Sequence, residues 1–351
     1  MLLNKAYYTF KFLVPRRLQI ELRRYYVHRK RSLPAKDWPI DHNAGKPPEG
    51  WTGWPDGKKF ALVLTHDVEA ARCFEKCQIL AEIEERRGFR SCFNFVAQDY
   101  QVPAKLRHYL IDHGFETGIH GLTHDQNPFR SAAIFKKQAV TINRYLEEWG
   151  SAGFRSPSMY HDLTLLHHLN IEYDASTFDT DPFEPQPDGM GTIFPFWVRG
   201  NGNQKGYVEL PYTIPQDFLL FILMKEQTID IWKKKLDWIA DHNGMALFIA
   251  HPNYMNFDKS PSFEEYPARR YVEFLDYIQS QYKDQYWHIL PREMARWWKA
   301  DVGGPQTSSE ITPIPEAGSM KHENPPLPPF GKGEQDNIPP LCKGGMGGFS
   351  Y

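Results

Sequence analysis

The segment Phe60-Ala-Leu-Val-Leu-Thr-His-Asp-Val-Glu69 runs from five apolar residues directly into a group of polar, titratable ones. A short apolar run after a turn signal, here Asp56-Gly57, is typical of a buried strand. The carboxyl end of such a strand is where α/β folds place their chemistry. Because side chains alternate along a strand, Asp67 and Glu69 point to one side and His66 to the other. The two carboxylates can act as metal ligand and proton acceptor, whereas a plainer interpretation makes Asp67 the N-cap of the next helix.

A second short strand is predicted over residues 115–119, and it leads into the sequence His120-Gly-Leu-Thr-His124. Two histidines four residues apart lie on one face of a helical turn, a spacing that suits two imidazoles on one divalent cation. The chain has 14 histidines, so a chance pair of exposed loop histidines is the alternative. A histidine pair at one strand end and a carboxylate at another is harder to obtain by chance, and the combination predicts a metal site.

These stretches resemble the motifs of the polysaccharide deacetylases with the NodB homology domain, also called carbohydrate esterase family 4. The first motif of that family, Thr-Phe-Asp-Asp or Thr-x-Asp-x-Asp, corresponds to residues 65–69. The second, His-(Ser/Thr)-x-x-His, corresponds to residues 120–124, and the third, Arg-x-Pro-x-Gly, to residues 155–159. The last motif, a leucine shortly before a histidine, is matched by residues 247–251. The motifs agree in order and approximate spacing over about residues 58–300.

The sequence also departs from the family pattern at several positions. Glu69 stands where the shifted first motif has Asp, Gly121 where the second has a hydroxyl residue, and Met159 where the third has Gly. The fourth family motif, an Asp-rich strand end, is matched only loosely. Three aspartates are candidates for its role: Asp174, Asp179 and Asp181.

The resemblance, together with electrostatics, implies a role for each motif residue. A divalent cation, with zinc as the expected ion, would be held by three ligands: Glu69, His120 and His124. Asp67 would accept a proton from water, Arg155 would keep Asp67 ionised, and His251 would protonate the leaving amine. The backbone N–H of Ser158 would help to stabilise the oxyanion. The alternatives are a surface ion pair for Arg155 and a turn position for His251.

Length and composition fit a large α/β protein. The chain has 351 residues, of which 41% are hydrophobic, and its formal net charge of −2 argues against a general nucleic-acid binder. We expect a basic N-terminal helix and a Pro/Gly/Trp-rich connection over residues 1–57, a catalytic domain over 58–300 and a disordered Pro/Gly-rich tail over 301–351. Alternating strands and helices predict a distorted (β/α) barrel of the NodB-homology type, with residues 181–217 as an inserted lid or rim.

The basic, partly amphipathic segment 11–31 is interpreted as a helix that packs on the barrel, or as a peripheral contact with an anionic membrane surface. Neither a signal peptide nor an apolar stretch of about 18 residues is recognisable. The four cysteines follow no disulfide or metal pattern, which suits a reducing compartment. We therefore expect a cytoplasmic protein, with peripheral contact at the inner face of the membrane as an option. The oligomeric state is left open.

The first functional hypothesis is a metal-dependent hydrolase that removes an N-acetyl group from a sugar or glycan precursor, in the synthesis of a surface polysaccharide or glycoconjugate. Its expected partner is an N-acetylated sugar or glycan. The alternatives are an amidohydrolase on a small non-sugar amide and a catalytically silent carbohydrate-binding protein. The substitution at Glu69 keeps the silent alternative open.

Overall fold

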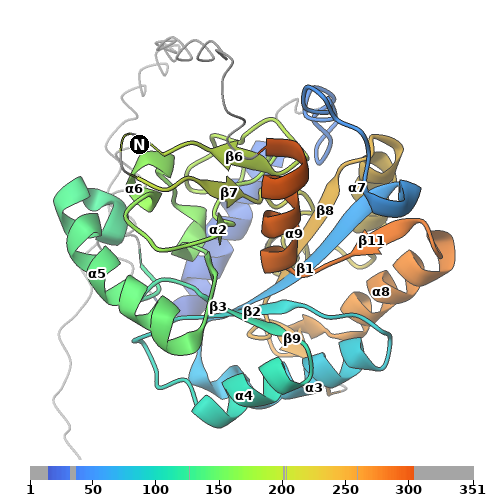
Figure 1. Cartoon of the computed structure of the whole chain (residues 1–351). Coiled ribbons are helices and arrows are strands. Elements are labelled where there is room, and N and C mark those ends of the chain that lie inside the picture. Colours follow the sequence, from blue (N-terminus) through green and yellow to red (C-terminus); the bar gives the residue numbers. More distant parts are fainter. Residues whose placement is uncertain are drawn as a thin grey trace, which may run out of the picture. The chain divides into compact units, whose positions relative to one another are not determined.

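The computed structural model describes residues 15–31, 37–125, 127–200, 202, 204–258 and 260–303 (Figure 1). The tail predicted over residues 301–351 lies outside this range, apart from its first three residues. Its predicted disorder therefore stays a prediction.

The centre of the fold is a curled sheet in which every pairing except that of β6 with β7 is parallel. Its strands are β1 (Phe60–Val68), β2 (Cys92–Phe95), β3 (Glu116–Ile119), β4 (Gly153–Phe154), β5 (Tyr173–Asp174), β6 (Phe196–Val198), β7 (Tyr207–Glu209), β8 (Met245–Ala250) and β11 (Tyr286–His288). The spatial order is β11-β1-β2-β3-β4-β5-β7-β6, and β8 also pairs with β1. The distorted (β/α) barrel predicted from the alternation of strands and helices is confirmed.

Strand β1 is the central strand because it pairs with three others and all nine of its residues are buried. A strand that is covered on both faces needs an almost continuous apolar sequence, which the run from Phe60 to Leu64 supplies. The register sets Asp67 opposite Asn94 on β2 and His66 opposite Ala250 on β8. Parallel pairing therefore brings the polar ends of these strands to one edge of the sheet.

The segment after β7 helps to close the sheet against β8. The N–H groups of Thr213 and Ile214 donate to the carbonyl oxygen of Leu247 at 3.1 and 3.2 Å. The hydroxyl oxygen of Thr213 accepts from the Leu247 N–H at 3.0 Å. The prediction of an inserted lid over residues 181–217 is therefore wrong for its second half, because β7 and the residues after it form part of the barrel wall. Proline and aromatic residues there concealed a strand of only three residues.

Helices follow most strands, as Figure 1 shows. They are α3 (Phe74–Glu85), α4 (Ala104–Asp112), α5 (Ala132–Trp149), α6 (Leu163–Leu166), α7 (Asp230–Asp241), α8 (Arg269–Gln281) and α9 (Pro291–Trp298). Helix α3 follows β1 after a 3-10 turn over Ala71–Cys73. Asp67 lies inside β1 and does not cap α3, so the N-cap interpretation is wrong. Helix α8 begins at Arg269, after β10 (Tyr266–Pro267), which pairs with β9 (Met255–Asn256).

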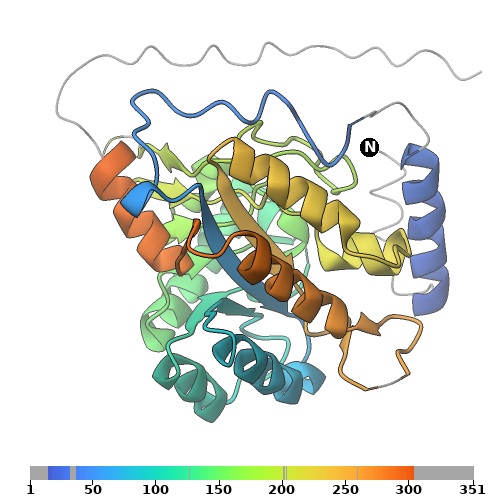
Figure 2. The ribbon, with the colours of Figure 1, turned by 90° about the vertical axis from the view of Figure 1, so that its right-hand side faces the viewer.

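The basic N-terminal segment contains helix α2 (Arg16–Arg31), which packs against a buried π-helix, η6 (Phe218–Leu223) (Figure 2). The Arg24 side chain is buried and donates from Nε to the carbonyl oxygen of Ile222 at 2.8 Å. Arg31 forms an ion pair with Glu226 at 2.6 Å. These contacts support the interpretation of this segment as a helix on the barrel. None of the described helices has the length and apolarity that a membrane crossing requires.

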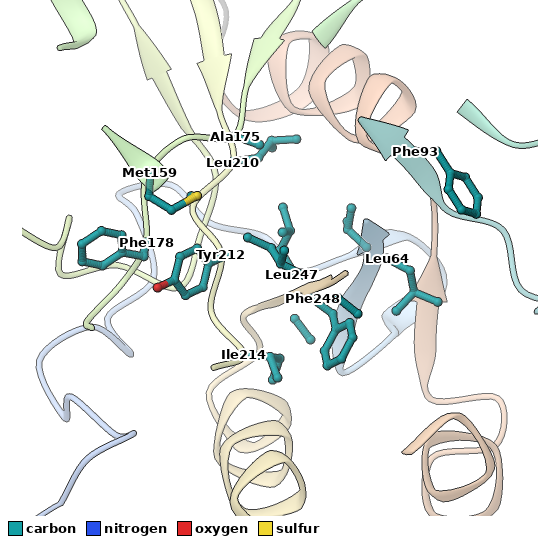
Figure 3. Packing of buried hydrophobic residues seen from close by; sticks show 14 of the residues in the cluster. Leu64, Phe93, Met159, Ala175, Phe178, Leu210, Tyr212, Ile214, Leu247 and Phe248 are labelled. Carbon is teal, nitrogen blue, oxygen red and sulfur yellow. The ribbon is translucent and has the colours of Figure 1, made fainter. Parts of the chain in front are cut away.

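Apolar side chains from β1, β8 and the segment around β7 fill the barrel, including Leu64, Leu247 and Ile214 (Figure 3). Trp54 is 3% exposed, and its ring packs with Trp51 and Trp298. Trp51 and Trp54 therefore pack against helix α9 and cover one side of the domain. The three described cysteines are buried free thiols: Cys73, Cys77 and Cys92.

Candidate active site

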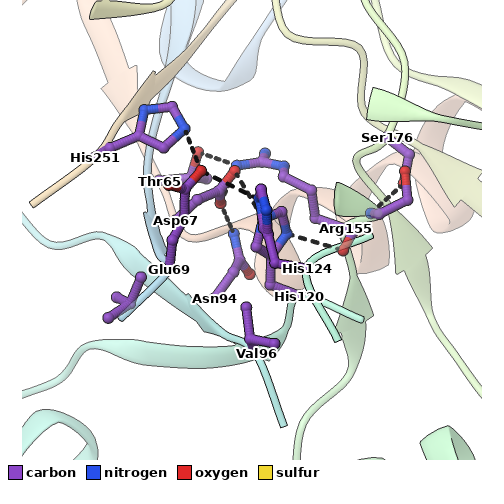
Figure 4. A network of polar contacts seen from close by, with 12 residues as sticks. Thr65, Asp67, Glu69, Asn94, Val96, His120, His124, Arg155, Ser176 and His251 are labelled. Carbon is purple, nitrogen blue, oxygen red and sulfur yellow. Dashed lines mark hydrogen bonds and ion pairs between the residues drawn. The ribbon is translucent and has the colours of Figure 1, made fainter. Parts of the chain in front are cut away.

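The carboxyl ends of several parallel strands converge on one polar network (Figure 4). Asp67 and Glu69 come from the end of β1, and His120 follows β3. Arg155 follows β4, whose Phe154 pairs with Ile119 of β3, and His251 follows β8. The register of short parallel strands therefore places side chains far apart in sequence within reach of one another.

Asp67 and Arg155 form a buried ion pair. The Arg155 Nη1 lies 3.0 Å from Asp67 Oδ1, and the two side chains are 1% and 3% exposed. The Asn94 amide also donates to Oδ1, at 2.9 Å. Burial opposes ionisation of Asp67, but Arg155 and the nearby histidines outweigh it and lower the pKa of this carboxyl to about 2. Asp67 is therefore ionised at neutral pH, and its second oxygen, Oδ2, lies 4.0 Å from His120 Nε2.

Glu69, His120 and His124 form a group with the chemistry of a metal site. One potential ligand atom from each lies within 4.8 Å of the other two. Glu69 Oε1 is 3.2 Å from His124 Nε2, close to the roughly 3.4 Å that separates ligand atoms in a tetrahedral zinc site. Two imidazole nitrogens and one carboxylate oxygen are a ligand set that catalytic zinc uses, with a further position open to water. These residues fit a divalent ion after small side-chain adjustments.

The surroundings of His120 keep its ring in the form that binds a metal ion. Its Nδ1 lies 3.1 Å from the carbonyl oxygen of Arg155, which fixes the proton on Nδ1 and leaves the Nε2 lone pair available. Burial lowers the pKa of His120 to about 4, against the opposing effect of Asp67. The imidazole is therefore neutral at pH 7, the state that a metal ligand requires.

His251 stands on the other side of Glu69, with 3.9 Å between its Nε2 and Glu69 Oε1. Its Nδ1 lies 2.7 Å from Asp217 Oδ1, and its backbone N–H donates to Asp217 Oδ2 at 2.8 Å. The Tyr266 hydroxyl also donates to Asp217 Oδ2, at 3.0 Å. Burial disfavours the imidazolium, but Asp217 outweighs it and raises the pKa of His251 to about 9. A protonated imidazole held by a buried carboxylate can donate a proton from Nε2.

His66 points away from this site, as the strand alternation predicts. Its Nε2 lies 2.6 Å from Glu84 Oε1, and both side chains are fully buried. Tyr271 and Ser91 also donate to the Glu84 carboxylate, each at 2.6 Å. This second polar cluster ties β1 to α3 and α8 and does not line the cavity.

Among the three candidates for the fourth motif, only Asp181 lines the cavity of the site. Asp174 is held by the hydroxyl and backbone N–H of Ser176, at 2.8 and 2.9 Å. Asp179 forms a buried ion pair with Lys235 at 2.5 Å. Asp181 instead accepts from the Tyr212 hydroxyl at 2.9 Å.

Two of the departures from the family pattern, Gly121 and Met159, lie at positions with positive φ. Gly121 has φ +71°, and a Cβ there would lie 2.9 Å from the ring of Pro157, so the hydroxyl residue of the family does not fit this turn. Met159 adopts φ 54°, the left-handed conformation that glycine adopts without strain. Its side chain is 3% exposed and lines the cavity together with Ser158.

Sequence reasoning missed three residues of the site. Asn94 could have been found, because alternation along β2 places it opposite Asp67. Asp217 is the N-cap of η6 and Tyr254 lies in a turn after β8, and no local pattern marks either as a site residue. The Tyr254 hydroxyl donates to Glu69 Oε2 at 3.1 Å and so holds the carboxylate oxygen that faces away from His124.

Comparison with solved structures agrees with this architecture. A candidate polysaccharide deacetylase from Mycobacterium smegmatis is 19% identical, with a TM-score of 0.55 over 76% of this chain and 99% of the other. One from Pseudomonas aeruginosa is 17% identical, with a TM-score of 0.57 over 76% and 99%. PuuE allantoinase is 17% identical, with a TM-score of 0.58 over 77% and 100%. No family model and no curated protein matches the chain. The chain thus has the NodB-type fold of the polysaccharide deacetylases, as its motifs predicted.

Proposed function

We propose that this protein is a metal-dependent hydrolase that removes an N-acetyl group from a sugar or glycan precursor. The observation that carries the proposal is the grouping of Glu69, His120 and His124 beside the ionised Asp67, with His251 on the other side. Hydrolysis of an amide needs a proton acceptor for water and a proton donor for the leaving amine, and this arrangement offers one of each.

Asp67 is the proposed proton acceptor. Arg155 and Asn94 occupy its Oδ1, so the attacking water would meet Oδ2. A carboxylate with a pKa of about 2 is a weak base, and a divalent ion at Glu69, His120 and His124 would supply what it lacks by acidifying the water and polarising the acyl oxygen. The Ser158 backbone N–H, at the cavity wall, is the proposed second contact for the oxyanion.

His251 is the proposed proton donor. Its Nε2 would give a proton to the nitrogen as the C–N bond breaks, so that the products are a carboxylate such as acetate and a free amine. Asp217 would orient the ring and keep it protonated until that step. Arg155 would act through Asp67 as a positioning residue rather than touch the substrate.

A small non-sugar amide is the second candidate substrate. The observation in its favour is the similarity to PuuE allantoinase. That alignment covers 77% of this chain, about the same share as the 76% covered by the candidate polysaccharide deacetylase from Mycobacterium smegmatis. The sugar is preferred because the motifs at residues 65–69, 120–124 and 155–159 resemble those of the deacetylases. A cytoplasmic role in building a surface glycan, with peripheral membrane contact through α2, is part of the proposal.

The test is release of acetate from a panel of N-acetylated sugars and small amides by the full-length protein, with added zinc or with a chelator. We expect zinc-dependent release from a sugar, its abolition by chelation and its loss in Glu69→Gln. Release only from the small amides would favour the second candidate. A protein that binds the sugars but releases no acetate with any metal would support the catalytically silent alternative.

A further inference from the structure

Helix α2 forms one wall of the cavity that holds the candidate active site. Arg16, Gln19 and Arg23 line the same cavity as Glu69 and His124. The residues Gln19, Ile20, Arg24 and Val27 on the inner side of the helix are buried, which fixes α2 against η6. The N-terminal segment therefore contributes side chains to the site itself, at a position that the family motifs do not cover.

Arg23 presents a guanidinium to this cavity, where it interacts electrostatically with Glu184. Its Cζ lies 4.8 Å from the centre of the Phe218 ring, and Phe218 packs on Tyr254 with 4.6 Å between ring centres. Within the described part of the chain, no carboxylate lies within ion-pair distance of Arg23. By contrast, two neighbouring arginines of α2 are paired, Arg24 with Glu21 at 2.7 Å and Arg31 with Glu226 at 2.6 Å.

Arg16 brings a second positive charge to the same wall. Its pairing with Glu264 is loose, at 3.4 Å, and the Arg16 side chain remains 42% exposed. Both Arg16 and Arg23 act electrostatically on Tyr254, whose hydroxyl donates to Glu69 at 3.1 Å. The two guanidiniums therefore lie near the proposed metal group rather than at a remote edge of the cavity.

Two of the acidic residues that line the cavity are paired with other residues, Asp67 with Arg155 and Glu69 with His124. Glu184 and Asp181 share the Tyr212 hydroxyl, at 2.8 and 2.9 Å, on the wall formed by the segment after β5. Burial raises the pKa of both carboxyls, and the proximity of Asp181 raises that of Glu184 further, while the charge of Arg23 lowers it. The pair therefore shares about one proton at neutral pH and balances Arg23 with less than its full negative charge.

We propose that Arg16 and Arg23 form an anion subsite, and that the substrate is an N-acyl sugar that carries a phosphate group. This inference rests on the proposed function, because it names the substrate class of the same site. A guanidinium presents several N–H donors in a planar fork that matches phosphate oxygens, and such charge-assisted hydrogen bonds are stronger than neutral ones. The phosphate would contact α2 while the acyl group lies at Glu69, His120 and His124. A sugar 1-phosphate and a lipid-linked sugar phosphate share this chemistry.

The test compares binding of N-acetylglucosamine 1-phosphate and N-acetylglucosamine to the full-length protein by calorimetry. Each titration is run with zinc and with a chelator, so that phosphate bound to the metal is separated from phosphate bound to α2. The variants are Arg23→Gln and Arg16→Gln, and the matched control is Arg29→Gln, which removes a charge from the same helix outside the cavity. Circular dichroism checks that α2 stays folded.

We expect the phosphorylated sugar to bind at least about tenfold more tightly than the neutral one, with or without metal, as a charge-assisted hydrogen bond predicts. Arg23→Gln should remove most of this preference, Arg16→Gln part of it, and Arg29→Gln none. Equal affinity for the two sugars, or an equal loss in Arg23→Gln and Arg29→Gln, would overturn the subsite. If the preference is lost by chelation alone, the metal binds the phosphate and the inference is wrong.

Acetate release from the two sugars separates this inference from the proposed function. Release from both without a charge preference would leave the deacetylase proposal standing and refute the subsite. Arg23-dependent binding of the phosphorylated sugar without acetate release would support the subsite and refute the hydrolase. A lipid-linked sugar phosphate that binds more tightly than the sugar 1-phosphate would identify the lipid as part of the substrate.

Discussion

Replacement of Asp67 by Asn tests both the stability and the chemistry that this carboxylate supplies. The side chain is buried, and its pKa lies near 2 rather than at the usual 3.8. A shift of this size corresponds to about 2 kcal/mol of unfolding free energy at neutral pH. Asn keeps an oxygen for Arg155 and Asn94 but removes the charge, so we expect Asp67→Asn to lose about 2 kcal/mol at pH 7.

The pH dependence of unfolding gives the sign of this contribution. A carboxyl with a lowered pKa in the folded state stabilises the protein above its unfolded pKa, and the contribution disappears as pH falls from about 5 towards about 2. Urea unfolding of the chelated protein should therefore show the largest difference between wild type and Asp67→Asn at pH 7 and little difference near pH 2. Asp112→Asn, at an exposed site on α4, is the control and should change stability little.

Turnover is the second property to be measured for Asp67→Asn. Loss of a general base is expected to lower turnover by about 10²–10⁴-fold, while metal binding is retained. An Asp67→Asn protein as stable as wild type at pH 7 would refute the role of the buried ion pair. One that loses metal while Glu69→Gln keeps it would show that the two carboxylates have the opposite roles.

Gly121→Ala should destabilise the protein by about 2 kcal/mol in urea, more than Gly150→Ala, because both have positive φ but only Gly121 has close neighbours. Glu69→Asp should lower zinc affinity in a calorimetric titration, because the shorter side chain draws its oxygen back from the imidazoles; higher affinity would mark Glu69 as a decayed ligand. Leu22 on α2 is 48% exposed, and Leu22→Glu should reduce cosedimentation of the protein with anionic phospholipid vesicles. A wild-type protein that does not sediment with the vesicles would refute peripheral membrane contact. Removal of residues after 305 should leave melting temperature and turnover unchanged, and a large drop in either would show that the tail docks on the domain.

The strand ends were predictable from sequence because their signals are local. The apolar run before Asp67 and the motif His120-Gly-Leu-Thr-His124 each lie within ten residues, and parallel pairing then brings them together. The barrel followed from the same alternation of strands and helices. Local patterns also indicated that Glu69 and His66 face opposite sides of β1.

The remaining parts depend on long-range contacts that no local pattern encodes. Asp217 matters because it lies beside His251, 34 residues later in the chain. Helix α2 was recognisable as basic and amphipathic, but its position against η6 decides that Arg23 faces the cavity. The strand β7 was missed because three residues between a Gly/Asn-rich segment and a Pro-containing one carry too little periodicity to distinguish a strand from a loop.

The central claim is that Glu69 binds the metal ion and that Asp67 acts as the base. The most direct measurement is a crystal structure of the full-length protein with zinc, with the ion located by anomalous scattering. We predict one ion at about 2.0–2.2 Å from Glu69 Oε1, His120 Nε2 and His124 Nε2, with Asp67 bound to Arg155 and outside ligand distance. An ion bound by Asp67 in place of Glu69, or no ion between the two histidines at saturating zinc, would contradict the account.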